Sequence, residues 1–369
     1  MEVNVPPNFH AIADLFLVPG RLIDVQSHAG GHINDSYRLT FALPEGDRRF
    51  LVQRINATVL PNPEHVMENI QRVTRHLTRR LQDQRVRDLG RRVLTLVETH
   101  SGRMFAHDDS GTCWRMYEFI EGARVVQACA SPRQAEQAGR AYGTFQSLLA
   151  DLGSPRLHEI LPDFHHTPRR LEALEKAVAA DRYGRVAAAR REIDFARAHR
   201  PQAGRLVALH EAGEIAERIV HNDAKMSNVL LDEVTGDWLC VTDLDTVMPG
   251  LALYDFGDMV RSMTCPAAED ERDLDKVELQ MPLFEALARG YLATAAALLA
   301  PAERDNLVFA GKLITLEQGV RFLTDFLCGD TYYKTDRPDH NLARCRTQFK
   351  LVESIERHES EMAELVRRL

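Results

Sequence analysis

Polar side chains that could bind a cation or accept a proton gather in one stretch, "IVHNDAKMSNVLLDEVTGDWLCVTDLDTV", residues 219–247. Asp223 and Asn228 follow an apolar run, and Asp243 and Asp245 come one predicted hairpin later. Carboxylate and amide oxygens are ligands that divalent cations such as Mg²⁺ accept in proteins. A carboxylate at this position can also take a proton from a hydroxyl group. The stretch therefore predicts a site for metal-assisted chemistry on a hydroxyl.

The spacing inside this stretch narrows the chemistry. Asp223 lies five residues before Asn228, as in the protein-kinase loop H-R-D-x-x-x-x-N, where the Asp accepts a hydroxyl proton and the Asn binds magnesium. Alternatively, His221, Asp223 and Asn228 cap a turn by bonding to backbone groups, as Asp and Asn often do. The spacing, together with Lys225, a hairpin and an Asp-x-Asp strand end, favours phosphoryl transfer.

Two glycines near the N-terminus could cover the phosphates of a nucleotide. Gly30 and Gly31 in "HAGGHINDSYRLTF" stand just before a predicted strand. Glycine lets the backbone approach phosphate closely and present its N–H groups. Tight β-turns use the same pair, so the prediction depends on the position of these glycines at the start of a β-rich region.

The elements that must hold these residues fall into two parts. From about residue 22 to 120, β-type runs dominate: "SYRLTFAL", "RRFLVQRIN", "RVLTLVETH" and "WRMYEFI". One helix interrupts them, "PEHVMENIQRVTRHLTRRL", with Pro63 in its first turn. After Gly122 the pattern is helical, except for the stretch at 219–247. The sequence predicts an α+β fold with a small β-rich N-lobe, residues 1–121, and a larger, mainly helical C-lobe, residues 122–369.

Composition sets further bounds. The 369 residues are too many for one compact core, and the net charge of −8 without a basic block argues against a nucleic-acid surface. The six cysteines have no CxxC spacing, which indicates reduced thiols rather than disulfides or a zinc site. The stretch "FEALARGYLATAAALLA" carries charges and reads as a core helix rather than a membrane span. With no evident leader peptide, we expect a cytoplasmic protein.

The motifs together resemble a known group of proteins. They are "GGHIN", "FLVQRIN", "HNDAKMSNVLLD", "DLDTVMPG", "YDFGD", "RFLTDFLCGDTYY" and "HNLARCRTQFKLV". The central ones resemble the Brenner-type motif of the aminoglycoside phosphotransferase and choline kinase superfamily. The whole set, which spans residues 30–352, is similar to the N-acetylhexosamine 1-kinases. The resemblance implies a bilobal protein-kinase-like fold that binds ATP between its lobes.

The resemblance also implies roles for individual residues. Asp223 would be the catalytic base, and Lys225 would contact the γ-phosphate. The expected ligands of Mg²⁺ are Asn228, Asp243 and Asp245. The expected ATP-binding residues are Gly30, Gly31, His32, Ile33, Gln53, Glu118 and Ile120, the last two in a hinge that bonds adenine. Arg321 and Tyr332 match positions that hold the hexosamine.

Some assignments stay open at this point. The third strand of a protein kinase carries a lysine for the phosphates, and here Gln53 or Arg54 takes its place; neighbouring strand residues face opposite sides, so only one can face the cleft. The helix partner of that lysine would be Glu64 or Glu68, although both suit a solvated helix face.

Other residues have two interpretations as well. His165 and His166 could suggest a metal site, but a turn that leads into a helix at Pro168 is favoured. Asp255 and Asp258, in "YDFGD", resemble a DFG triplet but follow the metal-binding Asp243, and in this superfamily that acid more often braces the catalytic loop by hydrogen bonds. Arg321 could contact a sugar, or it could form a salt bridge with a neighbouring aspartate.

We therefore expect ATP- and Mg²⁺-dependent phosphorylation of an N-acetylhexosamine (GlcNAc or GalNAc) at its anomeric hydroxyl, giving the sugar 1-phosphate and ADP. The alternatives are a kinase of the same fold that acts on another sugar, an aminoglycoside or an amino alcohol, and a pseudokinase regulator. Complete Asp223, Asn228 and Asp243 positions argue against the pseudokinase. We expect no nucleic-acid, membrane or obligate protein partner.

Overall fold

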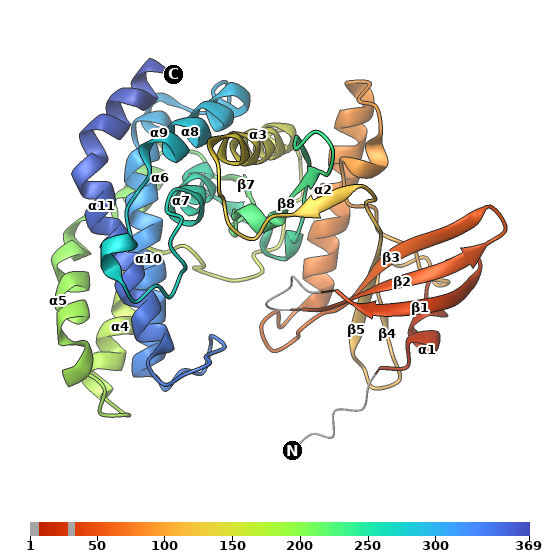
Figure 1. The fold of residues 1–369 in the computed structure, drawn as a ribbon, viewed down its shortest axis with the longest axis horizontal. Coiled ribbons are helices and arrows are strands. Elements are labelled where there is room, and N and C mark those ends of the chain that lie inside the picture. The colour runs from red at the N-terminus through yellow and green to blue at the C-terminus, as the bar shows by residue number, and fades with distance from the viewer. Residues whose placement is uncertain (1–6, 29–33) are drawn as a thin grey trace.

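The computed structural model describes residues 7–28 and 34–369. Within them, a twisted five-stranded antiparallel sheet in the N-terminal part stands beside a mainly helical C-terminal part (Figure 1). The strand order is β1-β2-β3-β5-β4. The elements of this part are α1 (Phe9–Ala13), β1 (Arg21–Ser27), β2 (Asp35–Leu43), β3 (Gly46–Arg54), α2 (Pro63–Asp83), β4 (Ala106–His107) and β5 (Cys113–Glu118). The predicted α+β fold is confirmed.

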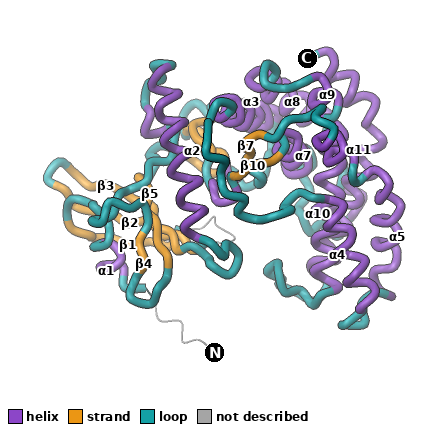
Figure 2. The backbone as a smooth tube through the Cα atoms, turned by 180° about the vertical axis from the view of Figure 1, so that it is seen from behind, coloured by secondary structure: helices purple, strands orange, loops and turns teal. Residues whose placement is uncertain are grey.

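Helix α2 lies between the sheet and the helical part, as Figure 2 shows from behind. Pro63 occupies its first turn, where a missing N–H costs nothing. Its apolar residues recur at helical spacing and are buried, for example Val66, Ile70 and Val73. These side chains belong to the large core of the C-terminal helices, whereas the sheet has its own core. The predicted helix is confirmed, and it couples the two parts.

The C-terminal part is built around α10, most of whose residues are buried. Its helices are α3 (Pro132–Leu149), α4 (Thr167–Ala180), α5 (Arg190–His199), α6 (Arg205–Glu211), α7 (Ala252–Met263), α8 (Met281–Ala295), α9 (Pro301–Asp305), α10 (Leu307–Leu327) and α11 (His340–Arg368). Helices α3 and α8 pack closely at Gly139. A Cβ at that position would lie only 2.4 Å from the Leu287 carbonyl oxygen, so the approach requires glycine. Helix α8 is the predicted core helix. Among the described residues, no helix combines the length and the apolar character that a membrane crossing requires.

Two small sheets carry the stretch of polar residues. One has the order β6-β8-β9, with β6 (Ala123–Val125), β8 (Val229–Asp232) and β9 (Trp238–Val241). The other pairs β7 (Arg218–Val220) with β10 (Met248–Gly250). The predicted β8–β9 hairpin is confirmed. Its turn is closed by the Asp232 carboxylate, which accepts the backbone N–H groups of Val234 and Thr235 at 2.9 and 2.8 Å.

One predicted strand is absent from the described structure. Residues 92–100 form only isolated bridges, Leu96 with Tyr117 and Thr99 with Phe16. The segment does bond to β5, where the Val97 N–H donates to the Met116 carbonyl at 2.8 Å, but the pairing does not extend into a ladder. Val93 and Val97 are buried, so burial explains the apolar character of the segment without membership of a strand.

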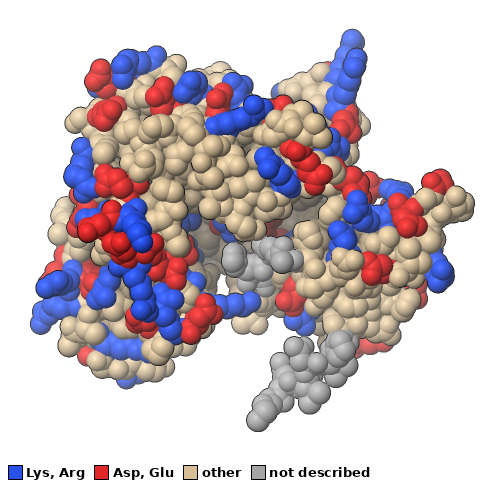
Figure 3. Space-filling view, viewed as in Figure 1, with Lys and Arg blue, Asp and Glu red and all other residues tan. Residues whose placement is uncertain are grey.

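Charged side chains of both signs are interspersed over the face drawn in Figure 3. On that face a hollow separates the sheet from the helical part. The chain passes from one part to the other between Glu118, where β5 ends, and Ala123, where β6 begins. The proposed boundary between the lobes, residue 121, lies within this connection.

Candidate active site

Asp223, Lys225 and Asn228 form one cluster on the loop between β7 and β8. The Asp223 carboxylate accepts the Lys225 Nζ at 2.7 Å and the Asn228 Nδ2 at 3.0 Å. The same amide nitrogen donates to the Asp223 carbonyl at 2.9 Å. Both of these bonds use the amide nitrogen of Asn228. No described residue donates to the Asn228 Oδ1, so this oxygen is available to bind a cation.

The charge state of Asp223 suits a proton acceptor. Its burial acts to raise the pKa, but the Lys225 ammonium and the hydrogen bond from Asn228 outweigh it and lower the pKa to about 2. The Asp223 charge in turn raises the pKa of Lys225 against the effect of burial. About 30% of the Asp223 side chain is exposed, so the ionised carboxylate can be reached by a substrate.

Asp243 stands at the end of β9 in a left-handed conformation, φ 58° and ψ 58°. Burial, and then the charges of Asp245 and Asp223, raise its pKa to about 6. Negative charges held this close favour a cation between them. The described residues contain no cluster of three His, Cys, Asp or Glu side chains placed to hold a metal. The Asp243 carboxylate and the Asn228 amide oxygen could nevertheless hold Mg²⁺. Proteins often bind this ion through one or two side chains, and phosphate groups of a substrate supply the other ligands.

Asp245 has different partners from Asp243. It is 2% exposed and accepts hydrogen bonds from the Arg115 Nη1 and the Asn34 Nδ2. Burial acts to lower the pKa of Arg115, but the neighbouring Asp245 carboxylate outweighs it and raises the pKa of Arg115 above its ordinary value. Asp245 therefore joins the catalytic region to β5 and to the start of β2.

Gln53, and not Arg54, faces this region. The Gln53 Oε1 accepts the Arg115 Nε at 2.9 Å, and the Gln53 Nε2 donates to the Ser36 Oγ at 2.9 Å. Arg54 points to the other side of the sheet and pairs with Asp35 at the surface. Sequence reasoning missed Arg115, although a charged residue inside the apolar run "CWRMYEFI" is an unusual feature that could have indicated it.

A cavity of about 160 Å³ opens between the sheet and the catalytic loop. Its lining includes five residues predicted or found above, namely Gln53, Glu118, Ile120, Asn228 and Asp243, together with Arg115. The Ile120 backbone N–H and C=O form no hydrogen bond with any described residue. These groups are therefore available for a ligand. Gly30, Gly31, His32 and Ile33 lie outside the described residues.

The segment beside this cavity is fixed from behind by one side chain. The Arg91 Nε donates to the Glu121 carbonyl at 3.0 Å, and its Nη2 donates to the Gly122 carbonyl at 2.9 Å and to Asp232 at 2.9 Å. Glu118 turns its carboxylate outward to Arg48, at 3.2 Å. The lining of the cavity at this segment is therefore backbone and apolar side chains, which suits a flat, apolar ligand ring with polar edges.

The loop between β7 and β8 is braced from below by Asp255 on α7. Its two carboxylate oxygens accept the backbone N–H groups of His221 and Asn222 at 2.9 and 2.7 Å. Gln146 on α3 donates to the same carboxylate at 2.8 Å. Asp255 is 0% exposed, so it has no access to a ligand. The predicted bracing role of Asp255 is confirmed.

Glu64 and Glu68 on α2 are the two candidates for the helix partner of the third-strand residue. They pair instead with Arg103 and His158, near the surface.

His165 and His166 have separate tasks. His166 caps α4, because its Nδ1 accepts the Arg169 N–H at 3.3 Å, and Pro168 lies in the first turn. The His165 ring bridges the Glu317 carboxylate at 2.7 Å and the Asn222 carbonyl at 3.0 Å. The predicted helix-entry turn is confirmed.

Arg321 and Tyr332 belong to a second cluster, on α10 and the loop after it. The Arg321 guanidinium lies 4.8 Å from the centre of the Phe164 ring and 5.9 Å from that of Tyr333, and it donates to Gln318 at 3.1 Å. Tyr332 stacks edge-on against Tyr333 and is 58% exposed. Since Phe164 precedes His165, which contacts Asn222, this cluster is linked to the catalytic loop by a short chain of contacts.

The aspartates near Arg321 are occupied elsewhere. Asp325 accepts the backbone N–H groups of residues 331–333, and Asp330 pairs with Arg185. Arg321 has no carboxylate partner among the described residues. Arg170 lies close enough for the Arg321 charge, after burial, to lower its pKa, and it bonds to the Phe164 carbonyl. Neither guanidinium forms an ion pair with a described carboxylate, although the charge of the buried Glu317 acts to raise the pKa of both.

Comparisons with known proteins agree with this geometry. The model of the phosphotransferase enzyme family (APH) matches residues 24–301, three quarters of the chain. The fold is similar to that of a microcompartment-associated aminopropanol kinase, with a TM-score of 0.60 and 16% identity over 95% of this chain and 98% of the other.

Two aminoglycoside phosphotransferases are also similar in fold. The one from Alicyclobacillus acidocaldarius has a TM-score of 0.58 and 14% identity over 100% of this chain and 98% of the other. The ADP-bound APH(2'')-Ib has a TM-score of 0.50 and 11% identity over 91% and 95%. At these identities the similar structures show a shared fold alone. The assignment of the chain to a family depends on the family model that matches residues 24–301. The chain belongs to the phosphotransferase enzyme family.

Proposed function

We propose that this phosphotransferase transfers the γ-phosphoryl group of ATP to the anomeric hydroxyl of an N-acetylhexosamine. The observation that carries the choice of acceptor is the pair of guanidinium groups, Arg170 and Arg321, which have no carboxylate partner among the described residues. Such a cluster repels polycationic aminoglycosides and amino alcohols. It suits a neutral polyhydroxyl ligand, because the fixed donors of a guanidinium match vicinal oxygens.

The nucleotide is proposed to occupy the cavity lined by Gln53, Ile120 and Arg115. The free backbone groups of Ile120 bond the adenine edge, and the phosphates extend toward Asp243. APH(2'')-Ib, which shares the fold, is ADP-bound. The residues His32 and Ile33, with the two glycines before them, are proposed to cover the phosphates.

Asn228 and Asp243 are the proposed holders of Mg²⁺, with Asp245 acting through its contact with Arg115. When bound, the ion neutralises charge on the β- and γ-phosphates. Asp223 orients the sugar hydroxyl and takes its proton as the bond to phosphorus forms and the bond to ADP breaks. Lys225 stabilises negative charge on the γ-phosphoryl oxygens, and it is released from Asp223 as that carboxylate gains the proton.

A substrate panel tests this proposal. GlcNAc, GalNAc, glucose, ethanolamine, 1-amino-2-propanol and kanamycin would each be incubated with ATP and Mg²⁺, with ³¹P NMR of the products. We expect turnover with an N-acetylhexosamine and a product that no longer reduces copper reagents, because C1 carries the phosphate. A product that still reduces copper would place the phosphate on another hydroxyl. Turnover with the amines alone would replace the sugar by an amino alcohol or aminoglycoside.

A further inference from the structure

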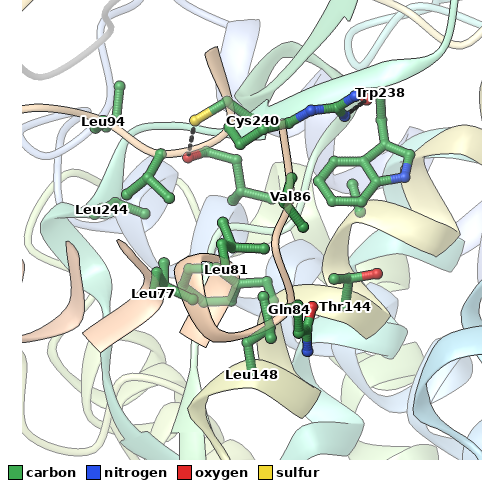
Figure 4. Close-up of a pocket in the computed structure, with 15 residues that line it drawn as sticks. Leu77, Leu81, Gln84, Val86, Leu94, Thr144, Leu148, Trp238, Cys240 and Leu244 are labelled. Carbon is green, nitrogen blue, oxygen red and sulfur yellow. Dashed lines mark hydrogen bonds between the residues drawn. The ribbon is translucent and has the colours of Figure 1, made fainter. Parts of the chain in front are cut away.

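A second cavity, of about 250 Å³, lies behind β9 between α2 and α3 (Figure 4). Its wall is mainly apolar and is formed by side chains of α2, the segment after it, α3 and the β9 strand; among them are Leu77, Leu81, Leu148, Trp238 and Leu244. Of its described lining, Leu94 is the one residue that it shares with the nucleotide cavity. It is therefore a separate space and not an extension of the active site.

One charged side chain lines this cavity, and it lacks a counter-ion. The Arg92 Nη1 donates to the Trp238 carbonyl at 2.9 Å, and the guanidinium carbon lies 5.8 Å from the centre of the Trp238 ring. The Arg92 Nε is buried and has no hydrogen-bond partner. No described carboxylate pairs with Arg92. The guanidinium charge at the wall of the cavity is therefore not neutralised by the protein, and an anionic group inside the cavity could pair with it.

We propose that this cavity is a binding site for an amphipathic carboxylate, whose head group pairs with Arg92 and whose hydrocarbon part fills the apolar space. The size is adequate, because an apolar cavity of ~150 Å³ already binds benzene. The lining explains the selectivity: apolar side chains favour a hydrocarbon body, while the unpaired guanidinium favours a negative charge over a neutral polar group. The proposal does not depend on the acceptor of the phosphotransfer reaction.

Calorimetric titration of the full chain tests it with two matched probes, octanoate and its neutral analogue octanamide. We expect one octanoate to bind per chain, with octanamide at least about tenfold weaker because it lacks the charge. Saturating ADP should leave octanoate binding unchanged, since the nucleotide cavity is separate. Equal affinities for the two probes, displacement of octanoate by ADP, or no saturable heat at millimolar concentration would each overturn the proposal.

Three variants locate the probe. Arg92→Met should lower octanoate affinity to the level of octanamide and leave octanamide binding unchanged. Arg87→Met, at an exposed position nearby, is the matched control and should bind octanoate as the natural chain does. Thr144→Phe adds a ring to the α3 wall of the cavity while keeping Arg92 in the sequence, and it should abolish binding of both probes. Unchanged octanoate affinity in a folded Arg92→Met or Thr144→Phe protein, judged by circular dichroism, would refute the site.

Discussion

Asp223 and Asp243 are neighbouring carboxylates whose pKa values are pushed in opposite directions. Lys225 and Asn228 hold the pKa of Asp223 near 2, although burial opposes them. Burial, and then the charges of Asp245 and Asp223, raise the pKa of Asp243 to about 6. Separation of this kind assigns different tasks to two similar groups. The arrangement favours Asp223 as the group that contacts the acceptor hydroxyl and Asp243 as the one that needs a cation.

The first prediction concerns Asp223. Asp223→Asn should lower kcat by on the order of a hundred-fold or more, because an amide cannot accept the hydroxyl proton. ATP affinity should change little, since the side chain is not proposed to contact the nucleotide. Steady-state kinetics and ADP titration would measure both. Asp237→Asn, in the exposed β8–β9 turn, is the control and should behave as the natural chain. Near-normal turnover in Asp223→Asn would remove this residue from the mechanism.

The second prediction concerns Asp243. Asp243→Ala should abolish turnover and remove the magnesium dependence of ATP binding, because Asn228 alone offers a single oxygen. Calorimetry with ATP, with and without Mg²⁺, separates these effects from a general loss of affinity. If ATP bound this variant with the same gain from magnesium as the natural chain, Asp243 would not be a ligand.

At the scale of elements, buried polar contacts connect the sheet to the catalytic region. Arg115 on β5 pairs with Asp245, which follows β9, and the two side chains are 1% and 2% exposed. Glu317 on α10 accepts His165 and Thr167 at 2.7 Å each; burial opposes them, but His165 and Thr167 hold its pKa below the ordinary value. Each contact fixes a long element against the loop that carries the chemistry.

The third prediction tests the Arg115–Asp245 contact. Arg115→Met should lower the free energy of unfolding by about 3–5 kcal/mol, because it leaves the Asp245 charge buried without a partner. Adding Asp245→Asn should restore much of that stability, since the charge is gone and Asn34 still has an acceptor. Urea unfolding would measure both variants. Arg54→Met breaks an exposed pair and should cost at most about 1 kcal/mol.

The same variants separate stability from binding. Because Arg115 lines the nucleotide cavity, the double variant should keep a raised KM for ATP even where its stability has recovered. A double variant with normal stability and a normal KM for ATP would show that Arg115 supports the fold alone.

At the scale of the whole molecule, the proposed acceptor region and the proposed nucleotide region come from different parts of the chain. The nucleotide cavity lies against the sheet, while Arg321 and Tyr333 lie on α10 and the loop after it. Figure 1 shows α10 at the centre of the helical part, away from the sheet. Changes in one region should therefore leave the affinity of the other intact.

The fourth prediction applies this to Arg321. Arg321→Ala should raise the KM for the hexosamine or lower kcat, while the melting temperature and the KM for ATP stay near those of the natural chain. Arg191→Ala, at an exposed position on α5, is the control and should change none of these values. A lower melting temperature together with loss of both affinities would mean that Arg321 supports the packing of α10 instead.

The sequence by itself determined the features that depend on neighbours along the chain. Spacing placed Asp223 and Asn228 on one loop, apolar periodicity predicted α2, and the turn "DEVTGD" predicted the β8–β9 hairpin. Local sterics and hydrogen bonds set these features, so local patterns reveal them. The segment 92–100 shows the limit, since an apolar run does not say whether it will pair with its neighbour in a ladder or by single bridges.

Only the tertiary structure decided which distant residues meet. Arg115 and Asp245 lie 130 positions apart in sequence, and His165 and Glu317 lie 152 apart. The register of β3 against β5 turned Gln53 toward the cleft and Arg54 toward the surface. Such pairings follow from the packing of whole helices and strands. A shift of one residue in the register of a strand would turn its buried side chains to the surface and bury their neighbours instead.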